Sequence, residues 1–248
     1  MRKSVFAVAL FVAPLAAAGT MPLPEGFDMT VAYNGSGQWR LSNPANDGNY
    51  TVSVNANGNW LISGTAAFAG TDWGYDLEVA PLTGSTNGPA IAFISSAFTV
   101  TNNNASPQNF VVTATQGALV FPGPTEILGS HSGNVGDNPS FGDGALLSTI
   151  SGSSMYQAQI DGATVRTLFD DPFSVAAAPN LTNSYGPGSF GWEGGNPAVA
   201  TSISIINEFT LSGNDNAGMT STFVVRVPTP GAASLLGVFG VAALRRRR

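Results

Sequence analysis

The sequence predicts an all-β chain, folded as a single antiparallel β-sandwich or jelly roll, and three observations support this fold class. Apolar and polar residues alternate with a period of two in several segments, which is typical of strands with one buried face. Turn-forming residues separate these segments. No sustained helical period occurs between residues 20 and 227. A β-helix is the alternative architecture, although no repeat of fixed length favours it.

The strands follow in chain order from this alternation. It is clearest between Asp72 and Val79, where Trp73, Tyr75 and Leu77 share one side with Val79. The same alternation predicts strands at residues 39–41, 50–54, 60–62, 156–160, 201–211 and 223–227. More continuous apolar runs at 91–100 and 110–115 are typical of central strands.

Turn chemistry connects these strands. Asn57-Gly58, between the segments 50–54 and 60–62, predicts a type I′ hairpin. Two stretches, 121–144 and 170–197, are rich in Gly, Pro, Asn and Ser and show no strand pattern. We expect them to be long loops of the same domain, and loops of that length often carry function.

Charge is scarce and unevenly placed in the 248 residues. Only 10% of the residues are charged, and the net charge is −6. Six of the nine cations lie at the two ends, so the body carries Arg40, Arg166 and Arg226 against all fifteen acids, a net charge of −12. Nucleic-acid binding requires clustered Lys and Arg and is therefore excluded. The absence of cysteine excludes thiol nucleophiles, disulfides and cysteine metal sites.

Residues 1–18 have the three parts of a secretory signal peptide. Arg2 and Lys3 form a positive start, residues 5–15 are apolar, and Ala16-Ala17-Ala18 is a cleavage site of the A-x-A type. The apolar part is too short for a membrane-spanning helix. We therefore expect a signal helix at 1–18 and an exported passenger domain at 19–226.

Residues 227–248 form a distinct tail. It begins Val227-Pro228-Thr229-Pro230-Gly231 and continues with thirteen uncharged, mostly apolar residues. It ends with four cations, Arg245, Arg246, Arg247 and Arg248. A helix of that length reaches about 20 Å, against about 30 Å of bilayer hydrocarbon, so it predicts a marginal anchor. The arginines are expected on the cytoplasmic side.

This tail resembles the PEP-CTERM sorting signal of exported bacterial proteins, which combines a Pro-x-Pro motif, a short apolar helix and a terminal arginine cluster. Pro228, Pro230, Gly231 and the arginines match, whereas Thr229 stands where the family usually has Glu. The resemblance covers only residues 228–248. It implies processing by an exosortase-type membrane protease-transpeptidase, after transient anchoring in the inner membrane, in a bacterium that makes exopolysaccharide.

The body shows no complete catalytic constellation. His131, the only histidine, lies between glycines at 129–133 without a G-x-S-x-G elbow, so we expect a solvated loop histidine. Glu193 lies beside Trp192 in a glycine-rich stretch, but a glycosidase needs a second, facing carboxylate. We therefore expect no enzymatic activity and no cofactor.

Calcium is the metal to consider, because hard cations bind carboxylate and carbonyl oxygens. The candidate ligands are Asp137 and Asp143 in the stretch 121–144, and Asp215 in the turn 212–216. None follows the spacing of an EF-hand. Aspartates in turns also bond their own backbone, and this turn role is the expected one, so no metal site is predicted.

The tryptophans divide into two groups. Trp39, Trp60 and Trp73 fall on the apolar side of predicted strands and are expected in the core. Trp192 falls in a predicted loop, and with Glu193 it is the candidate platform for a sugar ring.

These observations favour a non-enzymatic protein, exported to the cell surface or the extracellular matrix, with a structural or adhesive role in an exopolysaccharide or biofilm matrix. The expected partners are the exosortase-type enzyme, the membrane through the tail before processing, and extracellular polysaccharide. The alternatives are a carbohydrate-binding module and a secreted hydrolase.

Overall fold

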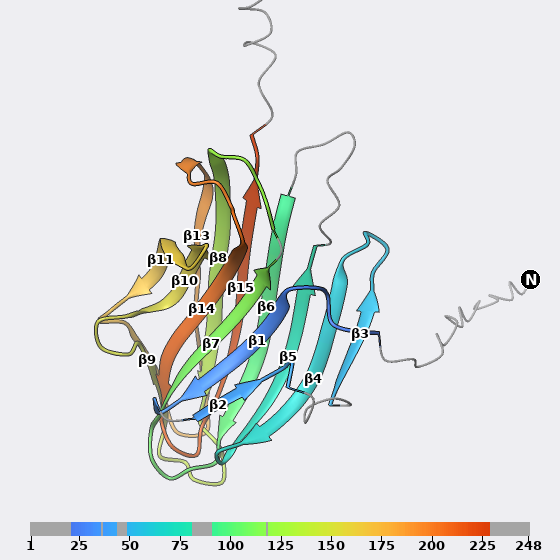
Figure 1. Cartoon of the computed structure of the whole chain (residues 1–248). Coiled ribbons are helices and arrows are strands. Elements are labelled where there is room, and N and C mark those ends of the chain that lie inside the picture. Colours follow the sequence, from blue (N-terminus) through green and yellow to red (C-terminus); the bar gives the residue numbers. More distant parts are fainter. Residues whose placement is uncertain (1–20, 36, 44–48, 81–90, 118, 229–248) are drawn as a thin grey trace, which may run out of the picture.

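The computed structural model describes residues 21–35, 37–43, 49–80, 91–117 and 119–228. In these segments the chain forms fifteen strands in two antiparallel sheets, packed face to face as a β-sandwich (Figure 1). The predicted signal helix at 1–18 and the tail from Thr229 onwards lie outside the described residues. Within the described segments, no helix has the length and apolar character needed to cross a membrane.

One sheet has eight strands and the other has seven. The eight-stranded sheet has the order β11-β10-β14-β7-β1-β2, and the β9–β12 pair joins it at β14. Its strands are β1 (Phe27–Tyr33), β2 (Gly37–Arg40), β7 (Gln108–Gly117), β9 (Ala145–Ser148), β10 (Ser154–Ile160), β11 (Ala163–Asp170), β12 (Ser174–Ala177) and β14 (Ser202–Leu211). The seven-stranded sheet has the order β13-β8-β15-β6-β5-β4-β3. Its strands are β3 (Tyr50–Val54), β4 (Trp60–Phe68), β5 (Thr71–Val79), β6 (Ile91–Asn102), β8 (Thr125–Gly136), β13 (Thr182–Asn196) and β15 (Asn216–Arg226).

The alternating segments are strands, as predicted. In β5 the side chains of Trp73, Tyr75 and Leu77 are buried, whereas Asp72 and Asp76, on the opposite face, are exposed. The strands predicted at 39–41, 50–54, 60–62, 91–100, 110–115, 156–160, 201–211 and 223–227 are confirmed with shifted ends. In β5 the period-two pattern therefore identified the buried face as well as the strand.

The hairpin between β3 and β4 is confirmed, but its predicted turn type is wrong. Val54 pairs with Trp60, which leaves a loop of five residues rather than two. Only Gly58 of the turn pair has a positive φ, of 82°, whereas a type I′ turn needs two such residues. Asn55 closes the longer loop, because its backbone N–H donates to the Asn59 carbonyl at 2.9 Å.

Aromatic rings from both sheets join the two layers. The Phe98 ring of β6 stacks on the Phe209 ring of β14, with centroids 6.0 Å apart. Trp73 of β5 meets Phe110 of β7 edge to face at 5.3 Å. Trp39 lies in the same core cluster, as predicted. Burying each such large side chain contributes about 1.5–3 kcal/mol, so this layer of rings is a main source of the sandwich's stability.

The two stretches predicted as long loops are mostly strands, and this prediction is wrong. The stretch 121–144 contains β8, and 170–197 contains β12 and β13. The apolar alternation of β8 is hidden because glycines occupy core positions that rings of neighbouring strands fill. A Cβ on Gly129 would lie 2.5 Å from the Phe190 ring, and one on Gly133 would lie 2.6 Å from the Tyr185 hydroxyl. The strand β13 has three register irregularities against β8, which obscure its period as well.

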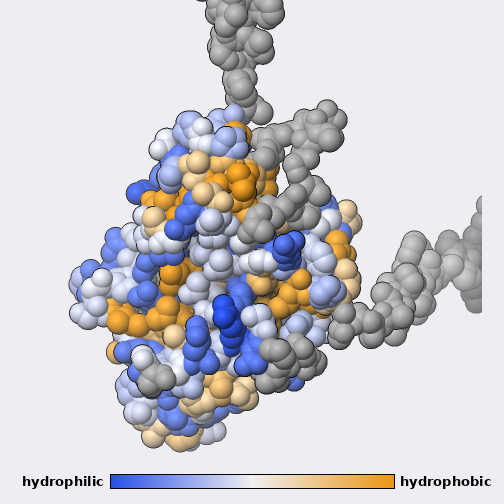
Figure 2. All heavy atoms as spheres, in the orientation of Figure 1, coloured by the Kyte–Doolittle hydropathy of each residue, from blue (hydrophilic) through white to orange (hydrophobic). Residues whose placement is uncertain are grey.

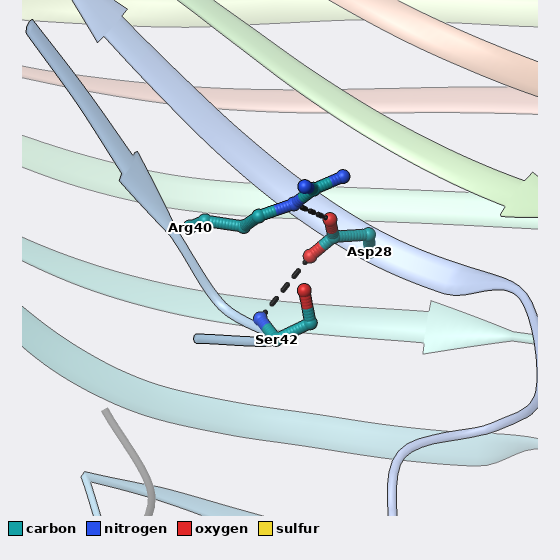
Figure 3. A network of polar contacts seen from close by, with 3 residues as sticks. All are labelled: Asp28, Arg40 and Ser42. Carbon is teal, nitrogen blue, oxygen red and sulfur yellow. Dashed lines mark hydrogen bonds and ion pairs between the residues drawn. The ribbon is translucent and has the colours of Figure 1, made fainter. Parts of the chain in front are cut away.

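The short edge strand β2 is tied to β1 by one acid. Asp28 of β1 forms an ion pair with Arg40 of β2 and accepts a hydrogen bond from the Ser42 backbone N–H at 3.2 Å (Figure 3). An exposed ion pair contributes only about 0–1 kcal/mol. The contact therefore mainly positions the C-terminal end of β2, and it contributes little to the stability of the sandwich.

Uncharged polar groups cover much of the surface. In Figure 2, white and blue atoms spread over the visible face, and orange atoms gather in separate patches between them. This distribution fits a chain with 10% charged residues, in which Asn, Ser and Thr replace the usual surface charges.

Candidate functional site

The outer face of the seven-stranded sheet is hollowed into a broad depression of about 880 Å³, called the hollow below. Every strand of that sheet contributes to its lining. Two neighbouring rows of outward-facing residues cross the sheet there. One row is Ser184, Asn134, Gly218, Thr99, Gly74 and Thr65, and the other is Ser132, Thr220, Ala97, Asp76, Ser63 and Thr51.

The two rows consist of small residues, most of which can form hydrogen bonds, and the rest of the lining includes larger side chains such as Tyr75, Tyr185 and Met219. No side chain of the two rows is larger than Asn or Asp, and the glycines leave the backbone open to a ligand. Thr51 and Ser63 already share a hydrogen bond between their hydroxyls at 3.0 Å. The arrangement can therefore exchange hydrogen bonds with a ligand that carries many hydroxyl groups.

The hollow does not supply the acid pair of a glycosidase. Asp76 is the one acid among the described residues that line it. Glu78, two residues further along β5, is engaged elsewhere, because its Oε1 accepts hydrogen bonds from the side chains of Asn55 and Asn59 at 2.9 and 2.7 Å. A glycosidase needs two carboxyl groups facing each other across the sugar.

Trp192 and Glu193, the predicted platform, lie in β13 rather than in a loop. Trp192 is 42% exposed, and the Arg226 guanidinium lies 3.7 Å from the centre of its ring. Arg226 also pairs with Glu126 at 2.6 Å, and Glu193 pairs with Arg166 at 3.2 Å. One face of the indole is thus covered by a cation–π contact, which leaves less of the ring for a ligand. Trp60, predicted in the core, is only partly buried.

Trp192 and the hollow are on the same outer face but apart. Arg226, which covers Trp192, and Thr220, which lines the hollow, both point outward from β15. They are six positions apart along the strand, which is about 20 Å. The predicted platform is therefore outside the hollow, at the end of the face where β15 ends.

His131 is not the solvated loop histidine that we predicted. It lies in β8 with 1% of its surface exposed, facing the core. Its Nδ1 lies 2.8 Å from the Ser221 hydroxyl and its Nε2 lies 2.9 Å from the Tyr185 hydroxyl. Ser221 in turn donates to Asn207 Oδ1 at 3.1 Å, and the Asn207 amide donates to the Met155 carbonyl at 3.2 Å. We call these residues the His131 network.

The network assigns the proton of the imidazole. The Ser221 hydroxyl has one proton, and it is donated to Asn207 Oδ1. A ring proton on Nδ1, donated to Ser221, with Nε2 accepting from the Tyr185 hydroxyl, is the tautomer that agrees with this bond, and the Asn207 amide nitrogen lies 3.4 Å from Nδ1. Every polar atom of the neutral ring is then satisfied.

Burial also sets the charge of the ring. It lowers the pKa of His131 to about 3, and it raises the pKa of Tyr185 above its ordinary value. His131 is thus neutral and enclosed by the rings of Tyr156, Phe169 and Tyr185. A ring in this position cannot reach a substrate as a general base, which needs contact with the proton it removes.

The structure brings together the three calcium candidates, of which Asp215 lies far from the other two in the sequence. Carboxylate oxygens of Asp137, Asp143 and Asp215 all lie within 4.8 Å of one another, and we call these residues the acidic cluster. It lies at the end of the sandwich where β8 ends and β15 begins, at the bottom of Figure 1. Asp137 accepts hydrogen bonds from the backbone N–H groups of Gly144 and Asn180, at 3.0 and 2.5 Å. These donors lie 7 and 43 residues away from Asp137, so its hydrogen bonds are not the local turn contacts that we expected.

Asp215 is the most deeply buried member of the cluster. Its exposed fraction is 0%, its Oδ2 accepts from the Ser212 hydroxyl, and its Oδ1 has no hydrogen-bond partner. Burial raises its pKa, the Ser212 hydroxyl and the nearby Asn138 N–H lower it, and the carboxylates of Asp137 and Asp143 raise it again, with a net increase.

Comparisons with known proteins give little about this chain. No family model matches it, and no curated protein matches it. Among solved structures, a chain from the structure of infectious bursal disease virus Gx strain aligns at 11% identity and a TM-score of 0.24. The alignment covers 86% of this chain and 55% of that chain. A likeness at this level carries no argument about fold or function.

Proposed function

We propose that this chain is an exported, non-enzymatic protein of the cell surface or extracellular matrix, and that its jelly-roll-like passenger adheres to extracellular polysaccharide through the hollow. The observation that carries the proposal is the lining of the hollow by Ser, Thr, Asn, Asp and Gly from all seven strands. Its volume of about 880 Å³ is in the range of small-molecule sites, which suits a few sugar units of a longer polymer.

The chemistry favours a neutral polysaccharide. Hydroxyl and amide side chains donate to and accept from sugar hydroxyls, and Asp76 accepts from them. The passenger carries fifteen acids against three arginines, so it repels anionic polymers at long range. The His131 ring is sealed in the core, and Asp76 stands alone in the hollow, which supports adhesion over catalysis.

The export half of the proposal rests on the sequence of the two ends. The signal peptide at 1–18 and the tail at 228–248 would bracket the passenger, with the apolar tail helix held in the membrane until an exosortase-type enzyme processes it. Mass spectrometry of cell fractions tests this half. We expect a surface or extracellular chain that lacks residues 1–18, and an intact 248-residue chain in the cytoplasm would contradict it.

The adhesion half is tested by blocking the hollow. Thr220 is exposed in the hollow, and a Thr220→Tyr variant places a ring across it without changing the core. The matched control is Thr113→Tyr, which makes the same change on the outward side of β7 in the other sheet. The probes are immobilised neutral polysaccharides (cellulose, a β-1,3-glucan and a mannan) and anionic alginate.

We expect retention on at least one neutral polysaccharide, a loss of at least tenfold in Thr220→Tyr, and no change in Thr113→Tyr. Equal retention of both variants would rule out the hollow. A Trp192→Ala variant separates the two candidate surfaces, because binding through the indole platform would disappear in that variant and survive in Thr220→Tyr.

A further inference from the structure

The acidic cluster leaves a charge imbalance at one end of the sandwich. Three carboxylates within 4.8 Å repel one another, and burial makes the ionised form of Asp215 costly. The described segments contain three cationic side chains, and Arg40, Arg166 and Arg226 pair with Asp28, Glu193 and Glu126 instead. No cation of the described part of the chain therefore neutralises the cluster.

A second observation is that one oxygen of Asp215 is incompletely satisfied within the protein. Asp215 Oδ1 is buried without a hydrogen-bond partner, and it is the one carboxylate oxygen in that condition among the described residues. Buried oxygens of this kind are rare in native structures, because each one costs the full free energy of desolvation. Asp143 likewise accepts no hydrogen bond from a described residue, so two of the three acids have free oxygen atoms.

We propose that Asp137, Asp143 and Asp215 bind a Ca²⁺ ion. The ligand set is all oxygen, which suits a hard cation. Ligands of one Ca²⁺ lie about 2.3–2.6 Å from the ion, so two of them are at most about 5 Å apart, against about 4 Å for Mg²⁺. Three oxygens within 4.8 Å of one another are close enough to approach one ion, and the wider sphere of Ca²⁺ needs less inward movement of them than Mg²⁺ would. Water and backbone carbonyls complete the six to eight ligands that Ca²⁺ takes.

The ion would clamp connections that cross between the two sheets. Asp137 and Asp143 flank the connection from β8 to β9, and Asp215 closes the connection from β14 to β15. Asp137 also holds the Asn180 backbone, just before β13. The glycines beside Asp143 have positive φ values of 64° and 88°, a conformation that turns this connection back toward the cluster. A bound ion therefore joins segments from both sheets at one point.

The site is tested by the thermal unfolding of the full chain, first in EDTA and then in about 10 mM CaCl₂ or MgCl₂. The exposed side of Asp143 suggests an affinity of about 10⁻⁴–10⁻³ M, typical of extracellular modules. At that affinity we expect Ca²⁺ to raise Tm by about 3–10 °C. We expect Mg²⁺ to raise it by less than about a third as much, and calorimetric titration with CaCl₂ to show one site.

The informative variant is Asp143→Asn, because Asp143 is exposed and its loss costs no hydrogen bond. We expect its Tm in EDTA to stay within about 2 °C of the parent, while the Ca²⁺ shift disappears. The matched control is Glu25→Gln, which removes an exposed acid away from the cluster and should keep the full shift. Absence of a Ca²⁺ shift in the parent, a full shift in Asp143→Asn, or an equal shift with Mg²⁺ would each overturn the proposal. None of these outcomes depends on polysaccharide binding, so this site and the proposed function can fail separately.

Discussion

The His131 network and the acidic cluster are both buried and polar, and they differ in how their hydrogen bonds are completed. In the His131 network each donor has one acceptor, from Tyr185 through His131, Ser221 and Asn207 to the Met155 carbonyl. In the acidic cluster three acceptors converge, and Asp215 Oδ1 has no donor. The first arrangement is complete within the protein, whereas the second requires a proton or a cation.

This difference separates a structural polar group from a candidate ligand site. A buried network that is fully satisfied rigidifies the core and needs nothing from outside. A buried group of like charges without a counter-ion is destabilised, and whatever neutralises it stabilises the fold. Burial alone does not distinguish the two sites as candidate ligand sites, since His131 and Asp215 are both almost fully enclosed. The comparison therefore depends on the count of donors and acceptors.

The largest effect is expected from His131→Leu. The substitution keeps an apolar side chain of similar size but removes the acceptor for the Tyr185 hydroxyl and the donor to Ser221. Leaving such buried groups unpaired costs about 1–3 kcal/mol each, so the free energy of unfolding should fall by about 2–5 kcal/mol in a urea titration. The matched control is Ser130→Ala, the outward-facing neighbour, with an expected change within about 0.5–1 kcal/mol. Equal stability of the two variants would mean that the network does not hold the core.

The next effect is a loss of stability as the solution becomes acidic. The pKa of His131 is lowered to about 3 in the fold, against about 6.5 in the unfolded chain, so the unfolded state takes up the proton first. The contribution of His131 is complete above about pH 6.5 and is lost progressively as the pH falls toward about 3. Between about pH 7.5 and pH 5 the free energy of unfolding should fall by about 2 kcal/mol.

Urea titrations across that pH range test this slope, with His131→Leu as the control that should lack it. The groups that face the ring, Tyr156 and Tyr185, have pKa values raised by burial and do not titrate in this range. For Asp161, burial raises the pKa, but hydrogen bonds from the Ala200, Ser202 and Thr201 backbone outweigh it and lower the pKa to about 2. Its titration therefore lies below the range. If the free energy of unfolding falls equally with pH in the parent and in His131→Leu, the pH dependence comes from other groups.

The sequence predicted most of the fold because most strands place every second side chain in the core. It did not identify β1, β9, β11 or β12. It also took β8 and most of β13 for loops, because side chains of other strands complete the core beside them. The inward positions Gly129 and Gly133 contribute no side chain, and the rings of Phe190 and Tyr185 fill the space above them. A period-two pattern depends only on the type of residue at each position. A glycine that makes room for the ring of a neighbouring strand therefore looks like a loop residue.

The same limit applies to the sites. The three acids of the cluster were candidates because of their residue type. Their convergence depends on β8 ending, and β9 and β15 beginning, at the same end of the sandwich. The burial of His131 depended on placing the glycine-rich segment as a strand. The sequence gives no sign of the hollow beyond an excess of Ser, Thr, Asn and Gly. The hollow is formed by rows of residues that cross seven strands, and these residues are not close together in the sequence. A register prediction for the sheet would have been needed to find it.

The smallest expected effect has the opposite sign. Asp215→Asn keeps an oxygen that can accept from Ser212, removes one of the three like charges, and supplies an amide that can donate to Asp137 or Asp143. In EDTA its free energy of unfolding should therefore rise by about 1 kcal/mol, measured by urea titration at neutral pH. The gain should vanish or reverse in CaCl₂, because the parent then has the ion. A loss of stability in EDTA would mean that the Asp215 carboxylate is already satisfied within the protein, which would remove the difference between the acidic cluster and the His131 network.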